Sequence, residues 1–389
     1  MNAKSDAKSY GSIRPLHLMV IFILTTLGHA STLAQVFTNK EVGKKNEALK
    51  DSLKKSDYPY SLPIWGDKAT KAGYSLPYSA GISVQYFGSE SALILENLTV
   101  GFNNGPKYNL DGIIRFDEAK ALASAVTVRP DIWLFPFLNV YGILGTSQAS
   151  TSVNFGVWVP DESGIEKEIL HTGTVVDFKT TTFGLGITPT IGVGGGFIAL
   201  DLNVAWTDVP QLSKPARTFV FGPRFGKKFN LKKPEQNFAL WAGGFRVALN
   251  SETNGSINLS EVFPGGGAEI SSKIDQGIQK VGDAQQQVDA WWASLTSPEQ
   301  NNPVNKAKYE TANAALGRAG EILNAADGAV NTITTSTVQY SMDKRLKDPW
   351  NFVVGGQFQF NKHLMVRLEY GFLGSRTQVM TGVQYRFGL

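Results

Sequence analysis

The last forty residues, Trp350 to Leu389, read WNFVVGGQFQFNKHLMVRLEYGFLGSRTQVMTGVQYRFGL. Within them, three runs alternate apolar and polar side chains at every second position, which is the period of a β-strand. In the final run, one face carries Val379, Thr381, Val383, Tyr385 and Phe387. The opposite face carries Gln378, Met380, Gly382, Gln384 and Arg386. Charge occurs only on the second face, so the pattern predicts strands with one apolar and one polar face.

The length of these runs indicates a membrane protein. Each run has about eleven residues, whereas strands of soluble proteins usually have about five or six, and tilted strands of about 9–11 residues cross a bilayer. A chain that ends on such a strand, with aromatic residues at alternate positions, resembles the C-terminal assembly signal of Gram-negative outer-membrane β-barrels. The matching residues share one face and end on leucine in place of the usual phenylalanine: Val383, Tyr385, Phe387 and Leu389. The resemblance implies contact with the barrel assembly machinery during insertion.

Composition excludes several other classes of protein. Only 42% of the 389 residues are hydrophobic, which is no more than in soluble proteins. After the N-terminus, no apolar run reaches the length of about 18 residues that a spanning helix needs. The 40 glycines and 23 phenylalanines suit closely packed strands and interfacial aromatic belts. A net charge of +4 gives no reason to expect a nucleic-acid partner, and a chain without cysteine has no disulfides.

The first 34 residues have the features of a secretory signal peptide. Three basic residues precede an apolar run from Leu16 to Leu27, and small residues follow as far as Ala34. The mature chain is therefore expected to begin near Gln35. Residues 35–78 lack strand alternation and contain a lysine-rich helical segment followed by a turn-rich link. This N-terminal segment is expected to cap the periplasmic mouth of a barrel or to fold into it as a plug or gate.

From residue 79 to residue 389 the sequence predicts an all-β membrane barrel. About twelve antiparallel, up-and-down strands are expected, at 79–87, 94–103, 110–117, 122–134, 136–146, 174–189, 195–207, 216–229, 237–249, 349–360, 362–373 and 376–387. Brief connections, such as 104–109, alternate with longer ones, as periplasmic turns alternate with extracellular loops in bacterial barrels. The alternating residues 153–159 fall within an outer loop, and we expect them to form a hairpin extension with the start of 174–189.

The connection 250–348 is long enough to be a separate module in an extracellular loop. Apolar residues keep helical spacing on both sides of Pro298 and Pro303, which predicts an α-helical hairpin. Its apolar stripe has to be buried against itself, inside the barrel or against a partner protein. The candidate partner-binding residues are Ile274, Ile278, Val281, Val288, Trp292, Leu316 and Leu323.

An enzymatic barrel would need a general base, which is most often histidine. Of the four histidines, His17 and His29 belong to the expected signal peptide, and neither His171 nor His363 has a serine or aspartate at a recognisable spacing. No cluster of histidine and cysteine indicates a metal. The glycine cluster 192–196 lacks the Lys-Ser/Thr of a phosphate-binding loop. We therefore expect no catalytic site, no bound metal and no cofactor.

The polar face of the strands is expected to line the barrel interior, because Arg or Lys on the lipid side costs about 2–4 kcal/mol near the midplane. The charged residues assigned to this lining are Arg129, Asp131, Asp201, Arg224, Lys228, Arg246, Arg367, Glu369 and Arg386. Basic residues outnumber acidic ones in this set. One interpretation is a narrow barrel filled by salt bridges, and the other is a water-filled pore whose basic excess favours anions.

Three segments add a resemblance to a protein family: Leu62-Pro-Ile-Trp65-Gly-Asp67, Trp133-Leu-Phe-Pro-Phe-Leu-Asn139-Val-Tyr-Gly, and the ending from Asp348-Pro-Trp350-Asn-Phe to Tyr385-Arg-Phe387. They resemble a little-characterised group of Gram-negative outer-membrane barrels of about twelve strands. The resemblance covers most of residues 61–389 except the helical insertion. It implies a cell outer-membrane location with outer-membrane lipids as partners.

Two functions are compatible with these patterns. The first is a porin-like channel for small polar or anionic solutes, gated by the N-terminal segment or by the helical hairpin. The alternative is a closed barrel that presents the helical hairpin of 250–348 to a partner protein or surface ligand. The state of the interior separates them, because a closed barrel needs paired charges at every level and a pore needs unpaired ones.

Overall fold

The computed structural model describes residues 39–40, 42–161, 165–193, 195–210, 212–233, 235–249, 252–262 and 267–389. The strands among them are β1 (Asn39–Lys40), β2 (Tyr74–Ser75), β3 (Ala80–Phe102), β4 (Lys107–Asn109), β5 (Ile114–Phe135), β6 (Leu138–Pro160), β7 (Glu166–Val193), β8 (Gly196–Asp208), β9 (Ala216–Asn230), β10 (Asn237–Leu249), β11 (Glu252–Asn258), β12 (Thr337–Leu346), β13 (Trp350–Gln359), β14 (Leu364–Leu373) and β15 (Arg376–Phe387). The helices are η1 (Lys44–Asn46), α1 (Glu47–Lys55), α2 (Gly66–Lys71), α3 (Leu259–Val262), α4 (Ala268–Ser294), α5 (Ser297–Gln300) and α6 (Pro303–Val330). The predicted signal peptide 1–34 lies outside the described residues, as does Gln35.

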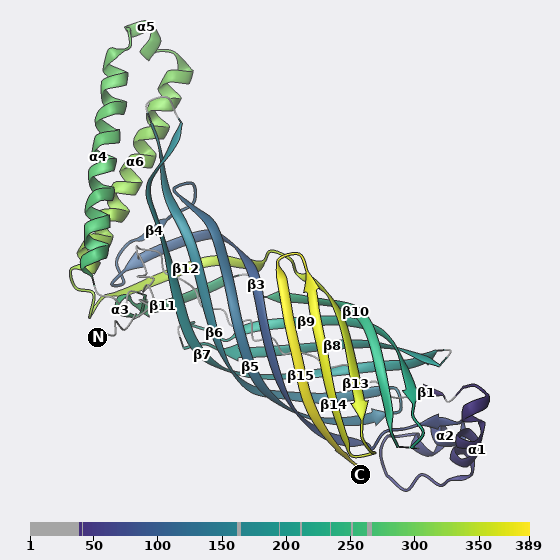
Figure 1. Cartoon of the computed structure of the whole chain (residues 1–389). Helices are drawn as coiled ribbons and strands as arrows, with labels where there is room; N and C mark the ends of the chain where they lie inside the picture. Colours follow the sequence, from purple (N-terminus) through teal and green to yellow (C-terminus); the bar gives the residue numbers. More distant parts are fainter. Residues whose placement is uncertain are drawn as a thin grey trace, which may run out of the picture.

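Within the described part of the chain, ten strands close into an antiparallel barrel (Figure 1). Their order is β3-β15-β14-β13-β10-β9-β8-β7-β6-β5, and β5 pairs again with β3. The last strand closes on the first, from the Arg376–Ser91 pair to the Phe387–Ala80 pair. A closed barrel has no unpaired edge, which is what a chain surrounded by lipid requires.

The described barrel therefore has ten strands in place of the twelve that were expected. Two pairs of expected strands are each one continuous strand: 79–87 with 94–103 in β3, and 110–117 with 122–134 in β5. The charged residues between them, such as Glu90 and Lys120, are exposed on the outer face, where water solvates them, so the strands continue through these positions. Because the strands merge, the turn at 104–109 lies at the end of the barrel opposite the C-terminus, and not at the same end as the connection at 361, as the predicted alternation required.

Large apolar side chains cover the outside of the barrel, and most positions between them point inward and are buried. The outward residues, 38 to 63% exposed, include Ile82, Val84 and Tyr86 on β3, Leu185 and Ile187 on β7, and Leu368 and Tyr370 on β14. This distribution is the reverse of that in a soluble protein and is typical of a membrane β-barrel. Among the described residues, no helix combines the length and the apolar character that crossing a membrane would require.

The residues of the predicted assembly signal lie on the outer side of the closing strand. Val383 and Tyr385 are exposed on β15, Phe387 is half-buried at its end, and Leu389 is exposed two residues later. Their apolar face is thus exposed on the outside of the barrel.

Four barrel strands continue beyond the barrel at the end opposite the C-terminus (Figure 1). β3, β5, β6 and β7 have 22 to 28 residues, against 10 to 15 in the other barrel strands. At about 3.3 Å per residue, β7 extends roughly 90 Å, three times the bilayer core of about 30 Å. Residues 153–159 do form a hairpin extension, but their partner is 167–174, which precedes the expected segment 174–189, because β7 begins already at Glu166. β4, β11 and β12 complete this extension, with β12 and β4 on the protruding part of β3 and β11 on β12.

One apolar core holds the extension together and continues into the barrel. In the extension it contains Val153, Phe155 and Tyr340, and inside the barrel it contains Phe245 and Val353, all 2% exposed or less. Burying each side chain of this size stabilises the fold by about 1.5–3 kcal/mol. The half of the barrel interior nearer the extension therefore contains part of the apolar core, beside buried polar side chains such as Thr180, Thr207 and Arg376.

The insertion between β11 and β12 forms a helical arm, which we define as α4, α5 and α6. Pro298 is the second residue of α5 and Pro303 the first of α6, positions at which the missing N–H costs nothing. The side chain of Asn302 accepts a hydrogen bond from the N–H of Val304 at 2.9 Å. The two long helices pack on each other and on the β6–β7 extension. Lys280 on α4 fixes this contact by donating a hydrogen bond to the carbonyl of Ile169 on β7 at 2.8 Å.

The predicted partner-binding stripe of the arm is used by this packing. Ile274, Val281, Val288, Leu316 and Leu323 are buried with the apolar core, and Ile278 packs against it from a half-buried position. Trp292 stacks on Tyr309 with ring centroids 4.5 Å apart. Gln285, which interrupts the stripe, donates a hydrogen bond to the side chain of Asn313 on α6. A partner would therefore meet the outer face and the tip of the arm, and not this stripe.

Residues 42–78 form an N-terminal cap beside the mouth of the barrel at the C-terminal end (Figure 1). Two backbone hydrogen bonds join the cap to the rim: the N–H of Leu62 donates to the carbonyl of Leu389, and the N–H of Ile64 donates to the carbonyl of Leu134. The Trp65 ring packs on Phe135, with centroids 5.1 Å apart. The segment lies at the rim, and its described residues do not form a plug through the barrel.

The core of the extension contains one lysine that predicts a pH-dependent stability. Lys344 on β12 is 1% exposed, and burial lowers the pKa of its ammonium group from 10.5 to about 7. Between these pH values the unfolded chain binds more protons than the folded one, so the lysine contributes a stability that rises with pH. The slope is up to about 1.4 kcal/mol per pH unit.

Lys344→Met should remove this rise, and the exposed Lys347→Met should keep it. Urea unfolding of the three proteins at pH values from 7 to 10, followed by tryptophan fluorescence, measures the difference. Equal slopes in the wild type and Lys344→Met would contradict the burial of a titrating lysine.

Candidate functional site

The barrel interior nearer the C-terminus is the candidate site, because the charged residues gather there. Seven of the nine predicted lining residues are buried inside: Arg129, Asp131, Asp201, Arg224, Arg367, Glu369 and Arg386. They come from strands around the whole barrel wall, since β5, β8, β9, β14 and β15 each contribute at least one. The inward pleat of each strand brings together residues that are up to 257 positions apart in the sequence.

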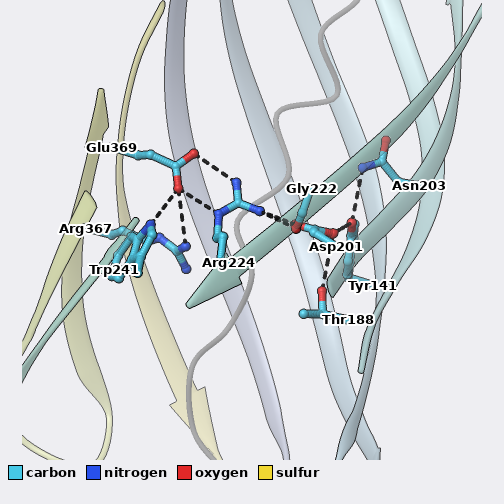
Figure 2. Close-up of polar contacts among 9 residues, drawn as sticks. All are labelled: Tyr141, Thr188, Asp201, Asn203, Gly222, Arg224, Trp241, Arg367 and Glu369. Carbon is cyan, nitrogen blue, oxygen red and sulfur yellow. Dashed lines mark hydrogen bonds and ion pairs between the residues drawn. The ribbon is translucent and has the colours of Figure 1, made fainter. Parts of the chain in front are cut away.

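Glu369 is the centre of one group, shown in Figure 2. Arg224 donates to its two carboxylate oxygens through Nε and Nη2, both at 2.9 Å. Trp241 Nε1 donates to Oε2 at 2.8 Å. Arg367 Nη2 lies 4.0 Å from the same carboxylate, and its guanidinium group stacks over the Trp241 ring at 4.3 Å. A bidentate pair of this kind is among the stronger protein hydrogen-bond arrangements, and it holds three strands, β9, β10 and β14, across the interior.

Asp201 extends this group toward β6 and β7. Its carboxylate lies 3.7 Å from Arg224 Nη1 and accepts hydrogen bonds from the Tyr141 hydroxyl and from Thr188 Oγ1 (Figure 2). Arg129 lies over the Tyr141 ring, with its Cζ atom 3.7 Å from the ring centroid. The ring needs a glycine on the neighbouring strand, because a Cβ atom at Gly186 would lie 2.2 Å from Tyr141 Cζ.

A second group lies nearer the mouth and is centred on Asp131. Its carboxylate lies 3.0 Å from Arg386 Nη2 and accepts hydrogen bonds from Gln384 Nε2 at 2.6 Å and from Asn139 Nδ2 at 2.9 Å. Arg386 Nε donates to the carbonyl of Tyr78 at 2.9 Å. This group therefore connects the barrel interior to the N-terminal cap.

Of the two remaining predicted residues, one lies at the mouth and one was assigned to the wrong face. Lys228 is half-buried and lines the hollow below the cap. Arg246 is exposed on the outer face of β10, and the prediction that it lines the interior is wrong. The prediction took apolar residues to be lipid-facing, but at this level Phe245 and Val247 belong to the apolar core and point inward.

Sequence reasoning missed three inward residues, Tyr141, Trp241 and Arg376, each buried. By the alternating pattern, Tyr141 and Trp241 would be expected to face lipid. In the structure their polar atoms make hydrogen bonds inside the barrel. Arg376 shares the polar face of Gln378 and Gln384, so the alternation of the last strand, continued by one step, indicates its position.

Two hollows lie in this part of the barrel. Between Gln85, Gln357, Arg367 and Gln384 a cavity of about 10 Å³ remains, which is about the space of one water molecule. A hollow of about 470 Å³ lies at the mouth between the cap and the barrel. There, burial raises the pKa of Tyr58 to about 12, so its hydroxyl stays protonated and donates to the carbonyl of Leu62 at 2.7 Å.

Among the described residues, one group brings metal-ligating atoms together: Asp117, Glu168 and His171. His171 lies in β7, and its Nδ1 is 2.8 Å from Glu168 and 3.5 Å from Asp117. All three residues are exposed on the extension. Exposed groups of this kind are common without a metal, and we assign none.

The fold and its interior define the class of this protein as a closed membrane β-barrel, with ten strands among the described residues. No family model and no curated protein matches the sequence.

Solved structures give faint likenesses. They include the β domain of the Bordetella autotransporter BrkA (10% identity, 79% of this chain and 100% of that one, TM-score 0.28) and an outer membrane channel from Pseudomonas putida F1 (9%, 80% and 96%, 0.27). A third is the translocator domain of the autotransporter NalP from Neisseria meningitidis (10%, 82% and 92%, 0.30). Likeness at this level carries no argument, so the assignment to a class rests on the strand pairing and on the two faces of the barrel. The predicted group of twelve-stranded relatives is not confirmed.

Glu369→Gln tests the charged interior. The substitution keeps the shape of the side chain but leaves buried arginines without their carboxylate, so we expect the free energy of unfolding to fall by about 3–5 kcal/mol. Glu96→Gln is the control, because Glu96 forms an exposed ion pair with Arg345 at 3.1 Å, and such pairs contribute about 0–1 kcal/mol. Urea unfolding of the proteins refolded in lipid vesicles measures both changes. A loss at Glu369 as small as that at Glu96 would contradict the pairing.

Proposed function

We propose that this chain is an outer-membrane protein of a Gram-negative bacterium, in which a closed β-barrel anchors the helical arm and presents it to a partner protein or surface ligand. The observation that carries the proposal is the filled interior. Paired charges occupy the half of the barrel nearer the C-terminus, and apolar side chains with buried hydroxyl and amide groups and Arg376 occupy the half nearer the extension. A barrel filled in this way serves as an anchor, whereas a pore would need a continuous water path.

The position of the arm supports the second part of the proposal. The arm, the extension and the longest connection lie at one end of the barrel, together with the short β14–β15 turn at 374–375 (Figure 1). The C-terminus lies at the other end with the β5–β6, β7–β8, β9–β10 and β13–β14 connections, which have two to six residues. In bacterial barrels the short turns face the periplasm and the long loops face outward. The arm would then point away from the cell, on strands that are continuous with the barrel wall.

The surface of the arm suggests where a partner would bind. With the apolar stripe packed inside, the exposed faces of α4 and α6 are polar. The tip differs, because Trp291 and the stacked pair Trp292 and Tyr309 gather there and Val304 is 62% exposed. Aromatic residues at a solvated tip are typical of contact sites in interfaces.

The first test uses the absence of cysteine from the chain. A single cysteine at the exposed tip, Ser297→Cys, should react with a membrane-impermeant maleimide on intact cells. Ser52→Cys, which is exposed on α1 of the cap, should react only after the outer membrane is opened. Labelling of Ser52→Cys on intact cells, or protection of Ser297→Cys, would reverse the proposed orientation.

The second test separates an anchor from a channel. In planar bilayers the mature protein should give no steady current, because its interior is filled. A variant lacking Ala268–Asn331 should also be silent; this deletion joins ends that lie close together, since Gly267 packs against Val330 and Ile333. A shift of the unheated protein on denaturing gels confirms that each sample is folded. Steady anion-selective current from the mature protein would overturn the proposal, and current from the deletion alone would make the arm a gate.

A further inference from the structure

Arg376 differs from the other arginines inside the barrel. It is the first residue of β15, is 1% exposed, and lies where the charged interior meets the apolar core. Its Nε, Nη1 and Nη2 atoms have no hydrogen-bond partner among the described residues. Its contact is with the face of the Phe245 ring, 5.3 Å from its Cζ atom. A cation–π contact contributes about 0.5–2 kcal/mol, far less than the cost of burying an unpaired charge.

Polar side chains with unused hydrogen-bonding capacity occupy neighbouring inward positions on the strands around Arg376. Ser91 faces Arg376 directly across the β15–β3 pairing, and Ser89 faces Gln378 in the same way. Asn351 faces Phe245 across the β10–β13 pairing. The hydroxyl oxygens of Ser89 and Ser91, both polar atoms of the Asn351 amide and the Gln378 Oε1 atom are buried without a hydrogen-bond partner among the described residues.

A glycine lets these side chains meet. Gly371 is the next inward position on β14 after Glu369, and a Cβ atom there would lie 2.5 Å from Gln378 Cγ and 2.8 Å from Asn351 Nδ2. The side chains of Gln378 and Asn351 therefore both lie over the backbone of Gly371. Side chains from four strands, β3, β15, β13 and β10, meet at this level of the interior. The fifth strand, β14, contributes Gly371, which has no side chain and so leaves room for them.

The charge balance indicates what this level binds. The described interior of the barrel buries five arginines, at 129, 224, 367, 376 and 386, against three carboxylates, at 131, 201 and 369, which leaves an excess of two positive charges. The three carboxylates lie in the groups centred on Glu369, Asp201 and Asp131, at the other levels. Buried charges in proteins are paired, so the counter-charge for Arg376 has to come from solution.

We infer that Arg376, with Asn351 and Ser91, binds a small monovalent anion of the halide class inside the barrel. The guanidinium and amide N–H groups and the serine hydroxyl are all donors, which suits an acceptor-only ligand. Enclosure on every side by strands favours a small ion over an organic anion. The inference concerns the interior of the barrel and is independent of what the arm binds.

The thermal stability of the full mature protein in detergent tests this site. With sodium chloride as the probe, the unfolding temperature should rise and then saturate, because an ion that binds only the folded state stabilises it. Sodium gluconate at equal ionic strength should give no such rise. Arg376→Met should lose the chloride-dependent shift. Arg246→Met, which removes an exposed arginine from the outer face, should keep it.

Gln378→Glu keeps the test decisive even if Arg376→Met does not fold. Its carboxylate lies two residues from Arg376 on the same face and replaces the ion with a counter-charge from the protein. We expect this variant to melt at a higher temperature than the wild type in gluconate and to be insensitive to chloride. A role of Gln378 in packing alone predicts the opposite sign, since a buried carboxylate without a partner destabilises a protein.

Crystals grown in sodium bromide locate the ion by its anomalous scattering. A peak within hydrogen-bond distance of the Arg376 guanidinium is the expected result. Peaks confined to the surface would mean an adventitious ion only and would overturn the inference. Equal melting of the wild type in the two salts, or a chloride shift that survives in Arg376→Met, would overturn it too.

Discussion

Closure of the sheet is the constraint on which the rest of this structure depends. In lipid, a backbone N–H or C=O group without a partner costs several kcal/mol, so the first and last barrel strands have to meet in register. β15 does this along its whole length, from Arg376–Ser91 to Phe387–Ala80. Once this pairing is fixed, the pleat decides which side chains face lipid and which face inward. The exposed row of Val383 and Tyr385 and the buried row of Gln384 and Arg386 are two consequences of one register.

The closed wall leaves an interior that has to be filled, and the chain fills it in two ways. Nearer the C-terminus, Glu369, Asp201 and Asp131 each hold arginines and neutral hydrogen-bond donors. Nearer the extension, buried hydroxyl and amide groups lie beside an apolar core that continues between the protruding strands. Buried ion pairs contribute little net stability, because desolvation offsets their attraction. We therefore attribute most of the stability to the barrel wall and the apolar core. The buried charges determine which strands face each other across the interior.

The sequence predicted the parts of this fold that depend on alternation. It identified the barrel, the polar lining around Arg224 and Glu369, and the protruding β6–β7 hairpin, because each follows from a period of two. The prediction failed where apolar side chains point into the barrel or charged side chains point outward. Arg246 was placed inside because Phe245 and Val247 were taken to face lipid, although an apolar core lies inside at that level. Glu90 and Lys120 read as breaks between strands, because a single sequence does not show that β3 and β5 have left the membrane there. The aromatic residues Tyr141 and Trp241 point inward because each donates a hydrogen bond to a carboxylate. That carboxylate comes from a strand distant in the sequence, so the sequence alone does not show the contact.

Because β6 and β7 are unbroken, the molecule should resist a force applied along these two strands better than a force applied across them. The helical arm rests on a ribbon whose strands run without interruption from the extension through the bilayer to the far rim. Ladder hydrogen bonds lie perpendicular to their strands, so a pull on the arm along the ribbon loads many of them at once in shear. Tension of this kind is shared with the whole circumference of the barrel, because each strand passes it to the next. A force applied to the tip of the arm would therefore be borne by the whole barrel wall and not by one strand alone.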